Sequence, residues 1–507
     1  MRGIRIRGAL AGLIAAIALT MSTPGSASAH GRLKSSTPAA GAHLASVPAQ
    51  LRLDFSEAPE LTFTMIQLQT VDGRAIALTA PAYATDSRRS IVARVAEAMV
   101  AGTYVVRWQI AGDDGHPVRG QFDFVVAPGA EGVGVAPVAE SGAVPGSSAA
   151  TPPHDMSAMH HDPVTMPQGD GFGVESPAYV IVRWIGFAAL LIVVGATAFR
   201  AFVLRRLRPD DDPAARAGER AMVDAAEHGA ARLGLFAVLL LAVTLGFRLF
   251  AQSYAMHGAD RSLDIVLVWQ MIRSTTWGAG WMLQLIGVLL AGAGFYGARS
   301  ASRRTEAAPL DSPDATRRPS TSLWWGVASA GAVACAFSPA FSGHASSSPR
   351  FRSLAVLADG LHVLAASSWL GTLAVVLVAG IAAARMQSAE RRGPLVRSLI
   401  TSFSTVALVA AGVATVTGVF AAWLHVGAIP NLWGTRYGIT LLIKLGVLGV
   451  VTLSGFYNWR FVQPRLGTDE ATVKLQRSAR VEVVVAVLVL LVTAILVASP
   501  TSMDASM

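Results

Sequence analysis

The chain has 507 residues, of which 52% are hydrophobic and only 14% charged. Soluble domains carry about 25% charged residues. The composition therefore excludes a disordered or fibrous protein, argues against a soluble enzyme and is typical of a polytopic membrane protein. The net charge of +9 does not require a nucleic-acid partner, because membrane proteins collect arginine in their cytoplasmic loops. With Cys335 as the one cysteine, disulfides within the chain, Cys-ligated zinc and iron–sulfur clusters are excluded.

Residues 1–29 have the pattern of a secretory signal peptide: a basic start, an apolar stretch and a small-x-small site ending at Ala29. The apolar stretch from Ala9 to Met21 is short for a span of about 20 residues, which favours cleavage over an uncleaved anchor. Cleavage before His30 would leave a histidine whose α-amine and ring Nδ1 chelate one metal ion. Such a chelate suits Cu(II), which prefers tetragonal nitrogen and oxygen ligation.

Residues 30–127 predict a small all-β domain, a sandwich or a barrel. Apolar residues alternate with polar ones in three stretches, 51–55, 104–110 and 122–126, and period-two alternation is typical of half-buried strands. Gly, Pro and Asp-Gly turn signals lie between them. Residues 128–176 are rich in Gly, Ala, Pro and Ser, which is typical of a flexible linker. The linker contains a Met/His cluster, namely Met156, Met159, His160 and His161.

The region 177–507 predicts an all-α membrane domain of eight spans. The apolar stretches are long enough to cross a bilayer and lie at about 178–199, 232–252, 277–298, 323–342, 356–383, 400–424, 438–458 and 481–499. With the β-domain outside, the inner loops hold twenty Arg and Lys residues and the outer loops hold five. This excess supports an outer, periplasmic β-domain on a bacterial cytoplasmic membrane.

Asp114 and His116 are separated by one residue in the segment Gly112-Asp-Asp-Gly-His-Pro117. In an extended segment they would share a face. Together with His30 they would supply an amine, two imidazoles and a carboxylate, which is a suitable Cu(II) ligand set. Turn formation alone would also explain an Asp-Gly-His triplet, so the residues leave both interpretations open.

Residues 30–126 resemble the CopC copper-binding proteins. The similar segments are His30-Gly-Arg-Leu-Lys-Ser-Ser-Thr-Pro38, Leu53-Asp-Phe-Ser-Glu57, Gly102-Thr-Tyr-Val-Val-Arg-Trp108 and Asp114-Gly-His-Pro-Val-Arg-Gly-Gln-Phe122. The resemblance implies an Ig- or cupredoxin-like Greek-key β-barrel that binds Cu(II) through His30, Asp114 and His116. Some members add a Met-rich Cu(I) site, whereas this segment has only two methionines.

The membrane part resembles the CopD copper-resistance family. The similar pieces are Ser342-Gly-His-Ala345, Asp359-Gly-Leu-His362 with Trp369-Leu-Gly371, Tyr437-Gly-Ile-Thr-Leu-Leu-Ile-Lys444, and Glu482 near the start of the last span. One chain with both parts resembles the fused, YcnJ-type copper transport proteins. In such a fusion the binding domain and the membrane domain cannot separate.

Ten of the eleven histidines lie in the β-domain, the linker, the outer loops or near the outer end of span five. Metal ligands gathered at the outer face favour capture of copper from outside, although outer loops are also richer in polar residues. The candidate copper path, which includes possible Cu(I) sites, consists of Met156, Met159, His160, His161, His344, Asp359, His362 and His425. Asp359 and His362 share a helix face, and ionisable groups within a membrane indicate function. Asp359 could instead only orient the histidine. Arg183, Arg248 and Lys444 are expected to snorkel or to pair with carboxylates and lipid.

We therefore expect a copper transport and homeostasis protein that is not an enzyme. Its exported domain would capture Cu(II) and pass it to the membrane domain, with import as the favoured direction. No phosphate-binding loop is present, so neither nucleotide nor nucleic acid is an expected partner. The alternatives are a membrane redox protein that holds haem or copper, and a periplasmic copper sequestration or resistance module.

Overall fold

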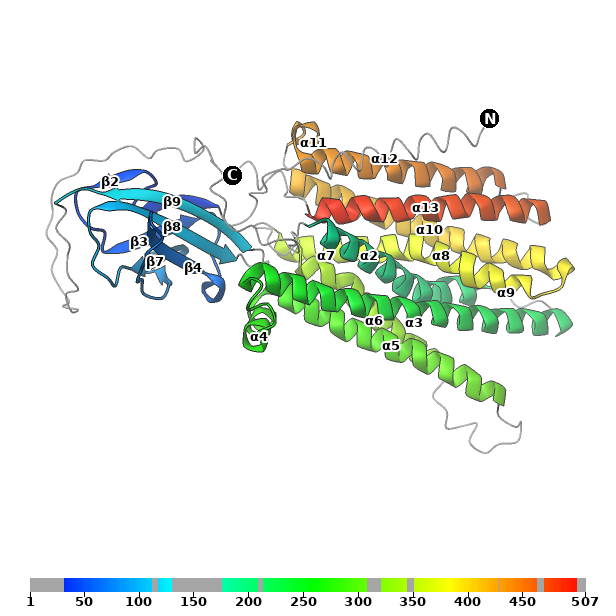
Figure 1. The fold of residues 1–507 in the computed structure, drawn as a ribbon. Coiled ribbons are helices and arrows are strands. Elements are labelled where there is room, and N and C mark those ends of the chain that lie inside the picture. The colour runs from blue at the N-terminus through cyan, green and yellow to red at the C-terminus, as the bar shows by residue number, and fades with distance from the viewer. Residues whose placement is uncertain are drawn as a thin grey trace. The chain divides into compact units, whose positions relative to one another are not determined.

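A computed structural model describes residues 32–111, 117–129, 176–207, 213–307, 321–343, 351–426, 428–462 and 469–498 (Figure 1). These residues form two separate units, one of strands and one of helices. Each unit has its own hydrophobic core and is treated by itself below.

The β-unit consists of two facing sheets. One sheet has the strand order β1 (Leu33–Thr37), β3 (Gln50–Phe55), β7 (Ser87–Arg94), β6 (Ala82–Ala84). The other has the order β2 (Ala42–Leu44), β9 (Pro117–Val126), β8 (Gly102–Ala111), β4 (Met65–Thr70), β5 (Ala75–Ile76). A short 3₁₀ turn, η1 (Leu61–Phe63), precedes β4. Strand β2 pairs parallel with β9, and the other strand pairs are antiparallel.

The period-two stretches form the core of this unit, as predicted. Leu51, Leu53 and Phe55 of β3 are buried, and so are the inward residues of β8 and β9. One position of β9 has to be glycine: a Cβ added at Gly120 would lie 2.4 Å from the ring of Trp108, its register partner on β8. Since the ring could not stay in place, Gly120 is what allows the Trp108 indole to pack against Phe55 at a centroid distance of 5.2 Å.

Within the described ranges, eight helices of the helical unit are long and apolar enough to cross a membrane, which agrees with the predicted number of spans. In chain order its elements are α2 (Pro177–Ala198), η3 (Phe199–Val203), η4 (Leu204–Arg206), α3 (Pro213–His257), α4 (Ile265–Ser274), α5 (Thr276–Ala307), α6 (Thr321–Phe341), α7 (Arg352–Ala366), η6 (Ser367–Gly371), α8 (Thr372–Val375), η7 (Val376–Gly380), α9 (Ile381–Arg385), α10 (Ala389–Val426), α11 (Asn431–Gly434), α12 (Arg436–Tyr457), η8 (Asn458–Val462) and α13 (Asp469–Ala498).

Several helices differ from the apolar stretches that predicted them. Helices α3 and α10 begin well before the apolar stretches at 232 and 400, because their polar extensions consist largely of good helix formers. The fifth span is a chain of α7, η6, α8, η7 and α9, in which η6 and η7 are π-helical. π-helical turns inside α-helices occur frequently at functional sites. Helix α4 lies in a segment for which the sequence analysis expected only a loop.

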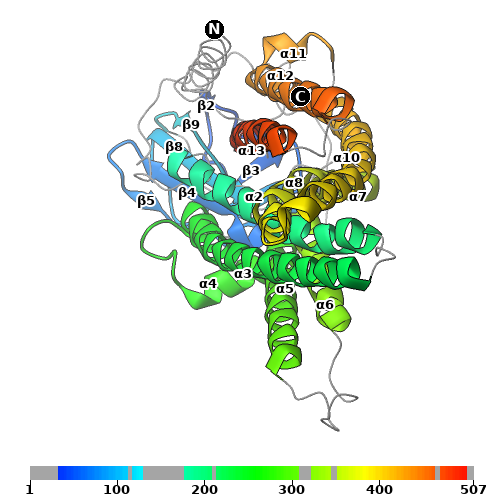
Figure 2. The same ribbon diagram turned by 90° about the vertical axis from the view of Figure 1, so that its right-hand side faces the viewer.

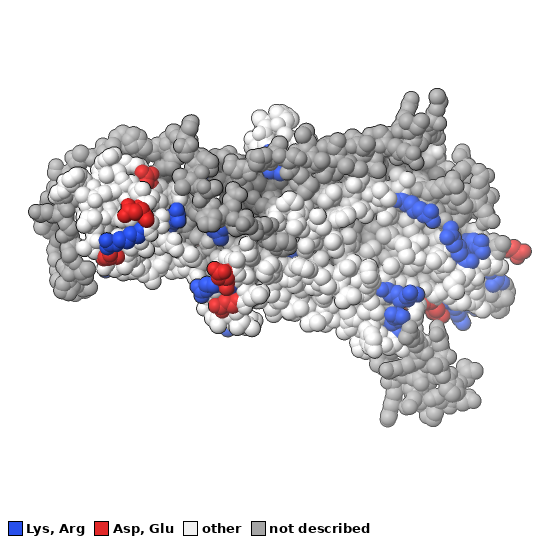
Figure 3. All heavy atoms as spheres, in the orientation of Figure 1, with Lys and Arg blue, Asp and Glu red and all other residues white. Residues whose placement is uncertain are grey.

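Small residues let the helices approach closely, as is common in membranes. A Cβ at Gly195 of α2 would lie 2.2 Å from the backbone of Gly371 in η6, and one at Gly294 of α5 would lie 2.3 Å from the backbone of Ala328 in α6. Figure 2 shows α13 between α12 and α2. On the face drawn in Figure 3, the surface of the long middle part of the helical unit shows no charged residues, and Lys and Arg gather near the end where α9 lies.

Candidate metal centre and membrane sites

The described residues nearest to the predicted copper ligands meet at one end of the β-unit. The backbone N–H of Ser56 donates to the carbonyl of Arg32 at 2.8 Å, and that of Glu60 donates to the carbonyl of Ala111 at 2.9 Å. Both donors belong to the loop 56–60 that follows β3. The loop therefore joins the start of β1 to the end of β8.

The predicted ligands His30, Asp114 and His116 lie outside the described residues. Arg32 stands two positions after His30, and Ala111 stands three positions before Asp114. Residues 112–116 follow β8 and precede β9 in the chain, and the register pair of these two strands next to them is Ala111 with Pro117. The segment that leads to His30 and the segment that leads to Asp114 therefore both leave the β-sandwich at the same end.

A positive charge lies close to this loop. Arg119, two residues into β9, donates from Nε to Gln109 Oε1 at 2.7 Å. Gln109 is its register partner on β8. Burial lowers the pKa of the Arg119 guanidinium, but arginine stays charged at neutral pH. Arg119 therefore places a fixed cation near the segment that carries Asp114 and His116.

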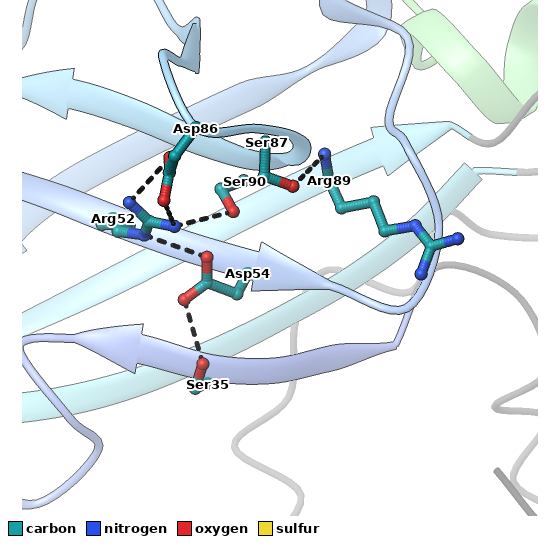
Figure 4. Close-up of polar contacts among 7 residues, drawn as sticks. All are labelled: Ser35, Arg52, Asp54, Asp86, Ser87, Arg89 and Ser90. Carbon is teal, nitrogen blue, oxygen red and sulfur yellow. Dashed lines mark hydrogen bonds and ion pairs between the residues drawn. The ribbon is translucent and has the colours of Figure 1, made fainter.

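A second polar cluster lies on the outer face of the four-stranded sheet (Figure 4). Arg52 of β3 contacts Asp54 at 3.0 Å and Asp86 at 2.9 Å, and also donates to Ser90 Oγ at 3.0 Å. Ser35 of β1 donates to Asp54 at 3.0 Å. The cluster joins β1, β3 and the β6–β7 turn, and its carboxylates are occupied by donors. It is a structural network.

The network shifts the pKa values of its carboxyl groups. Burial raises the pKa of Asp54, but hydrogen bonds from Ser90, Ser35 and Arg52 outweigh burial and hold the pKa below its usual range. The Arg52 hydrogen bond likewise lowers the pKa of Asp86. Both acids are therefore ionised at neutral pH, and their ionised forms stabilise the fold.

In the helical unit, His362 of α7 is held by α10. Its Nδ1 lies 2.9 Å from the carbonyl oxygen of Ala414 and 3.1 Å from Thr417 Oγ1. A carbonyl oxygen can only accept, so Nδ1 carries the proton and Nε2 keeps its lone pair. Such a backbone contact is a common way to fix the tautomer of a metal-binding histidine. Gly418 provides the space, because a Cβ there would lie 3.1 Å from His362 Cε1.

Asp359 precedes His362 by three residues on α7, and both side chains are half-buried within the helical unit. The charge of Lys444 on α12 acts on both of them. Lys444 belongs to the segment that resembles CopD, but the sequence analysis expected it only to snorkel or pair. An electrostatic interaction of Lys444 with the Asp359 carboxyl agrees with the expected pairing with a carboxylate, and His362 lies within reach of the same charge.

His425 is the penultimate residue of α10. It lies seven residues beyond Gly418, which is about 10 Å along a helix. Its ring packs edge-on against Tyr437 at a centroid distance of 6.3 Å. The structure thus does not join His425 to His362. The other path candidates, namely Met156, Met159, His160, His161 and His344, lie outside the described residues. Within the described ranges no group of three or more His, Cys, Asp or Glu side chains could hold a metal ion.

A second buried carboxyl group was not assigned any role by the sequence. Glu482 of α13 accepts hydrogen bonds from Ser454 Oγ at 3.1 Å and from Asn458 Nδ2. Ser454 and Asn458 lie four residues apart, so they share one face of α12 and its continuation. Two features of the sequence could have indicated a site here: the four-residue spacing of Ser454 and Asn458, and an acidic residue inside an apolar span.

The arginines expected to snorkel make contacts within the protein. Arg183 of α2 donates to the carbonyl of Ala494 at 3.4 Å and lies over the ring of Tyr179. Arg248 of α3 bonds to Gln284 and Ser342 on α5 and at the end of α6. These guanidinium groups therefore tie helices together.

Three protein families match consecutive parts of the chain. The CopC domain matches residues 33–127. The N-terminal domain of copper resistance protein D-like proteins matches residues 174–349, and copper resistance protein D matches residues 397–496. Copper resistance protein C from Escherichia coli is 33% identical over 115 residues, which are 21% of this chain and 90% of that protein.

The chain belongs to the CopC copper-resistance family. Its membrane part is similar to copper resistance protein D. Copper transport protein CutJ from Bacillus subtilis (strain 168) is 22% identical over 481 residues, which are 94% of this chain and 75% of CutJ. The crystal structure of CopC from Methylosinus trichosporium OB3b matches with 26% identity and a TM-score of 0.19, covering 20% of this chain and 98% of that structure. The predicted CopC–CopD fusion and its two-part fold are thus confirmed, and the chain is a multi-pass membrane protein of a copper transport and resistance family.

Proposed function

We propose that this protein imports copper across the cytoplasmic membrane of a bacterium, starting from Cu(II) captured by its exported β-domain. Signal peptidase removes residues 1–29, and the new N-terminal His30 chelates Cu(II) through its α-amine and ring Nδ1. Asp114 and His116 complete a tetragonal nitrogen and oxygen set of the kind Cu(II) prefers.

The observation that carries this proposal is the shared anchor at residues 56–60. That loop binds the backbone at Arg32 and at Ala111, so the segments that lead to His30 and to Asp114 leave from one end of the sandwich. Metal ligation requires such convergence of positions that are more than eighty residues apart in the chain. The membership of residues 33–127 in the CopC family supports the same metal.

The membrane step uses His362 and Asp359. The Ala414 carbonyl occupies the Nδ1 proton of His362, which leaves the Nε2 lone pair for a metal ion, and imidazole binds copper in either oxidation state. The linker cluster Met156, Met159, His160 and His161, with His344 and His425, would carry copper between the two sites. Thioether sulfur suits Cu(I), so transfer along this route is expected to involve reduction of the ion by an external donor.

A copper titration of the purified full-length chain tests the capture site. We expect His116→Ala to weaken Cu(II) binding, measured against a competing chelator, by at least about tenfold, since the loss of one ligand corresponds to more than about 1.4 kcal/mol. His43→Ala is the matched control, because His43 is an exposed histidine on β2 of the same domain. Equal affinity of the two variants would contradict the site.

Three further measurements test the proposal. Mass spectrometry of the mature chain should place its first residue at His30, and any other start would remove the chelating amine. Cells that lack the gene should accumulate less copper than wild type when copper is limiting. Unchanged or higher copper would contradict import, and a haem absorption band in the purified protein would favour a redox role instead.

A further inference from the structure

One face of α12 carries a polar–apolar–polar stripe. Its residues are Lys444, Val447, Val451, Ser454 and Asn458, with alternating spacings of three and four. This spacing places them on one side of a helix. Val447 and Val451 pack with residues of α13, and Ser454 and Asn458 bind Glu482 of α13. Val447, Val451, Ser454 and Asn458 therefore face α13.

The middle of the stripe, Val447 and Val451, is buried and apolar, and we call it the Val447–Val451 seal. Val447 and Val451 are 4% and 1% exposed, and they form one buried cluster with Leu370 of η6 and with Val485, Ala486 and Val489 of α13. Lys444 and Ser454 are ten residues apart, which is about 15 Å along the helix. An apolar constriction of this kind excludes hydrated ions. Lys444 therefore lies at one end of the seal, and Glu482, which Ser454 and Asn458 bind, lies at the other.

Glu482 is buried without a cation. Glu482 is 7% exposed and Asn458 is 8% exposed, and Asn458 Oδ1 is a buried acceptor that has no hydrogen-bond partner in the described part of the chain. The Glu482 carboxylate accepts hydrogen bonds from the hydroxyl of Ser454 and from the side-chain amide of Asn458. Among the described residues, the charged groups of the elements packed against α13 either bind elsewhere or form no ion pair with Glu482. These groups are Arg183 of α2, Arg397 of α10, Lys444 of α12, Arg460 of η8 and Arg480 of α13.

The donor set points to a proton. A carboxyl, a hydroxyl and an amide are hard oxygen and nitrogen groups, and no thioether or imidazole is among the residues that bind Glu482, which disfavours Cu(I). A buried carboxylate without a cation is costly, and taking up a proton removes that cost. A side-chain amide can donate to the ionised carboxyl through its NH₂ group, or accept from the protonated carboxyl through its oxygen. Asn458 therefore suits both charge states.

We propose that Glu482 is a proton-binding site that couples proton movement to copper movement across the Val447–Val451 seal. The Glu482 carboxylate takes a proton from water on one side of the membrane, becomes a neutral carboxylic acid, and returns the proton to water on the other side. This inference rests on the proposed transport function, and it supplies a driving force for a chain that carries no phosphate-binding loop.

Copper flux in liposomes that contain the purified full-length chain tests the coupling. In the wild type, a pH gradient should change the copper accumulation ratio by about tenfold per pH unit for one proton per ion. Glu482→Gln should still move copper down its own gradient but should no longer respond to the pH gradient, whereas Glu482→Asp should restore a response. Glu390→Gln, which changes an exposed carboxylate at the start of α10, should behave as wild type.

Three results would overturn the inference: wild-type copper flux that ignores the pH gradient, a Glu482→Gln variant that responds as wild type does, or a Glu390→Gln variant that loses the response together with Glu482→Gln. Wild-type copper flux that ignores the pH gradient would contradict the proton coupling but leave the transport function intact. Failure of the coupling can therefore be distinguished from failure of the transport function.

Proton binding at Glu482 can also be measured without copper, which tests the inference if no copper flux is found. Infrared difference spectra of the membrane-embedded protein at varied pH should show a carboxylic-acid C=O band that titrates in wild type and is missing in Glu482→Gln. The band should persist in Glu390→Gln. A wild-type spectrum without the titrating band, or a band that survives in Glu482→Gln, would contradict proton binding at Glu482 whether or not the protein transports copper.

Discussion

At the scale of single residues, the position of the His362 ring depends on a glycine. The ring crosses from α7 to α10, where its Nδ1 binds the carbonyl of Ala414, and this contact directs Nε2 away from α10. Gly418 lies under the ring, and a Cβ there would be 3.1 Å from Cε1 and 3.4 Å from Nδ1. The availability of the Nε2 lone pair therefore rests on the missing side chain at Gly418.

We expect Gly418→Val to lower copper transport by about tenfold or more while the protein still folds. The valine side chain would displace the ring, and misplacement of a ligand by about 1 Å is enough for losses of this size at a functional site. Gly412→Val is the matched control on the same helix, because nothing lies within 4 Å of a Cβ at Gly412. Copper uptake into liposomes measures both variants, and equal uptake by the two would contradict the role of the ring.

At the scale of elements, the Arg52 network holds three parts of the four-stranded sheet together. Arg52 bridges two carboxylates on β3 and on the β6–β7 turn, and Ser35 adds β1 to the network. The pKa values of Asp54 and Asp86 are both lowered by these donors. A lowered native pKa stabilises the fold above the unfolded pKa of Asp, about 3.9. That stability is lost as the pH falls through the lowered native values.

Arg52→Ala should therefore lower the thermal midpoint of the β-domain at neutral pH. The difference from wild type should persist down to about pH 4 and then vanish on further acidification, because both proteins then lose their ionised carboxylates. Thermal unfolding of the β-domain expressed alone, followed by circular dichroism, measures this. Arg89→Ala is the control, since the Arg89 side chain points away from the two carboxylates in Figure 4. A destabilisation by Arg52→Ala that is independent of pH would contradict the ionic mechanism.

At the scale of the whole molecule, the basic residues gather at one end of the helical unit (Figure 3). The loop after α3 and the loop after α9 follow spans two and five, so they lie on opposite sides of the membrane. The arginine and lysine excess of the loops predicts that the α9 side lies in the cytoplasm. The β-domain, which precedes span one, would then lie outside.

Cysteine labelling tests this orientation, because the chain has one cysteine and Cys335 is fully buried. In a Cys335→Ala background, a membrane-impermeant thiol reagent should label Asp260→Cys in intact cells. It should label Ser388→Cys only after the cells are opened. Both positions are exposed in the structure. The reverse pattern would place the β-domain in the cytoplasm and would contradict copper capture from outside.

The sequence alone determined the two-part fold, the strands around Leu53, Val106 and Phe124, and the eight spans. These features follow from hydrophobic periodicity and from stretch length, which are local properties of the chain. The sequence also predicted Asp359 and His362 as members of a copper path from their three-residue spacing inside a span, and that role stays a prediction. It did not predict α4, because that helix is too short and too polar in its flanks to be distinguished from a loop.

Only the tertiary structure decided which distant residues meet. The shared anchor of Arg32 and Ala111 on residues 56–60, the contact of His362 with Ala414, and the pairing of Glu482 with Asn458 all join separate elements. Periodicity indicates that a helix has a buried face, but it does not indicate which neighbour that face meets or at what height. Those choices arise from the packing of whole helices and sheets, in which small residues such as Gly371 set how closely two backbones approach.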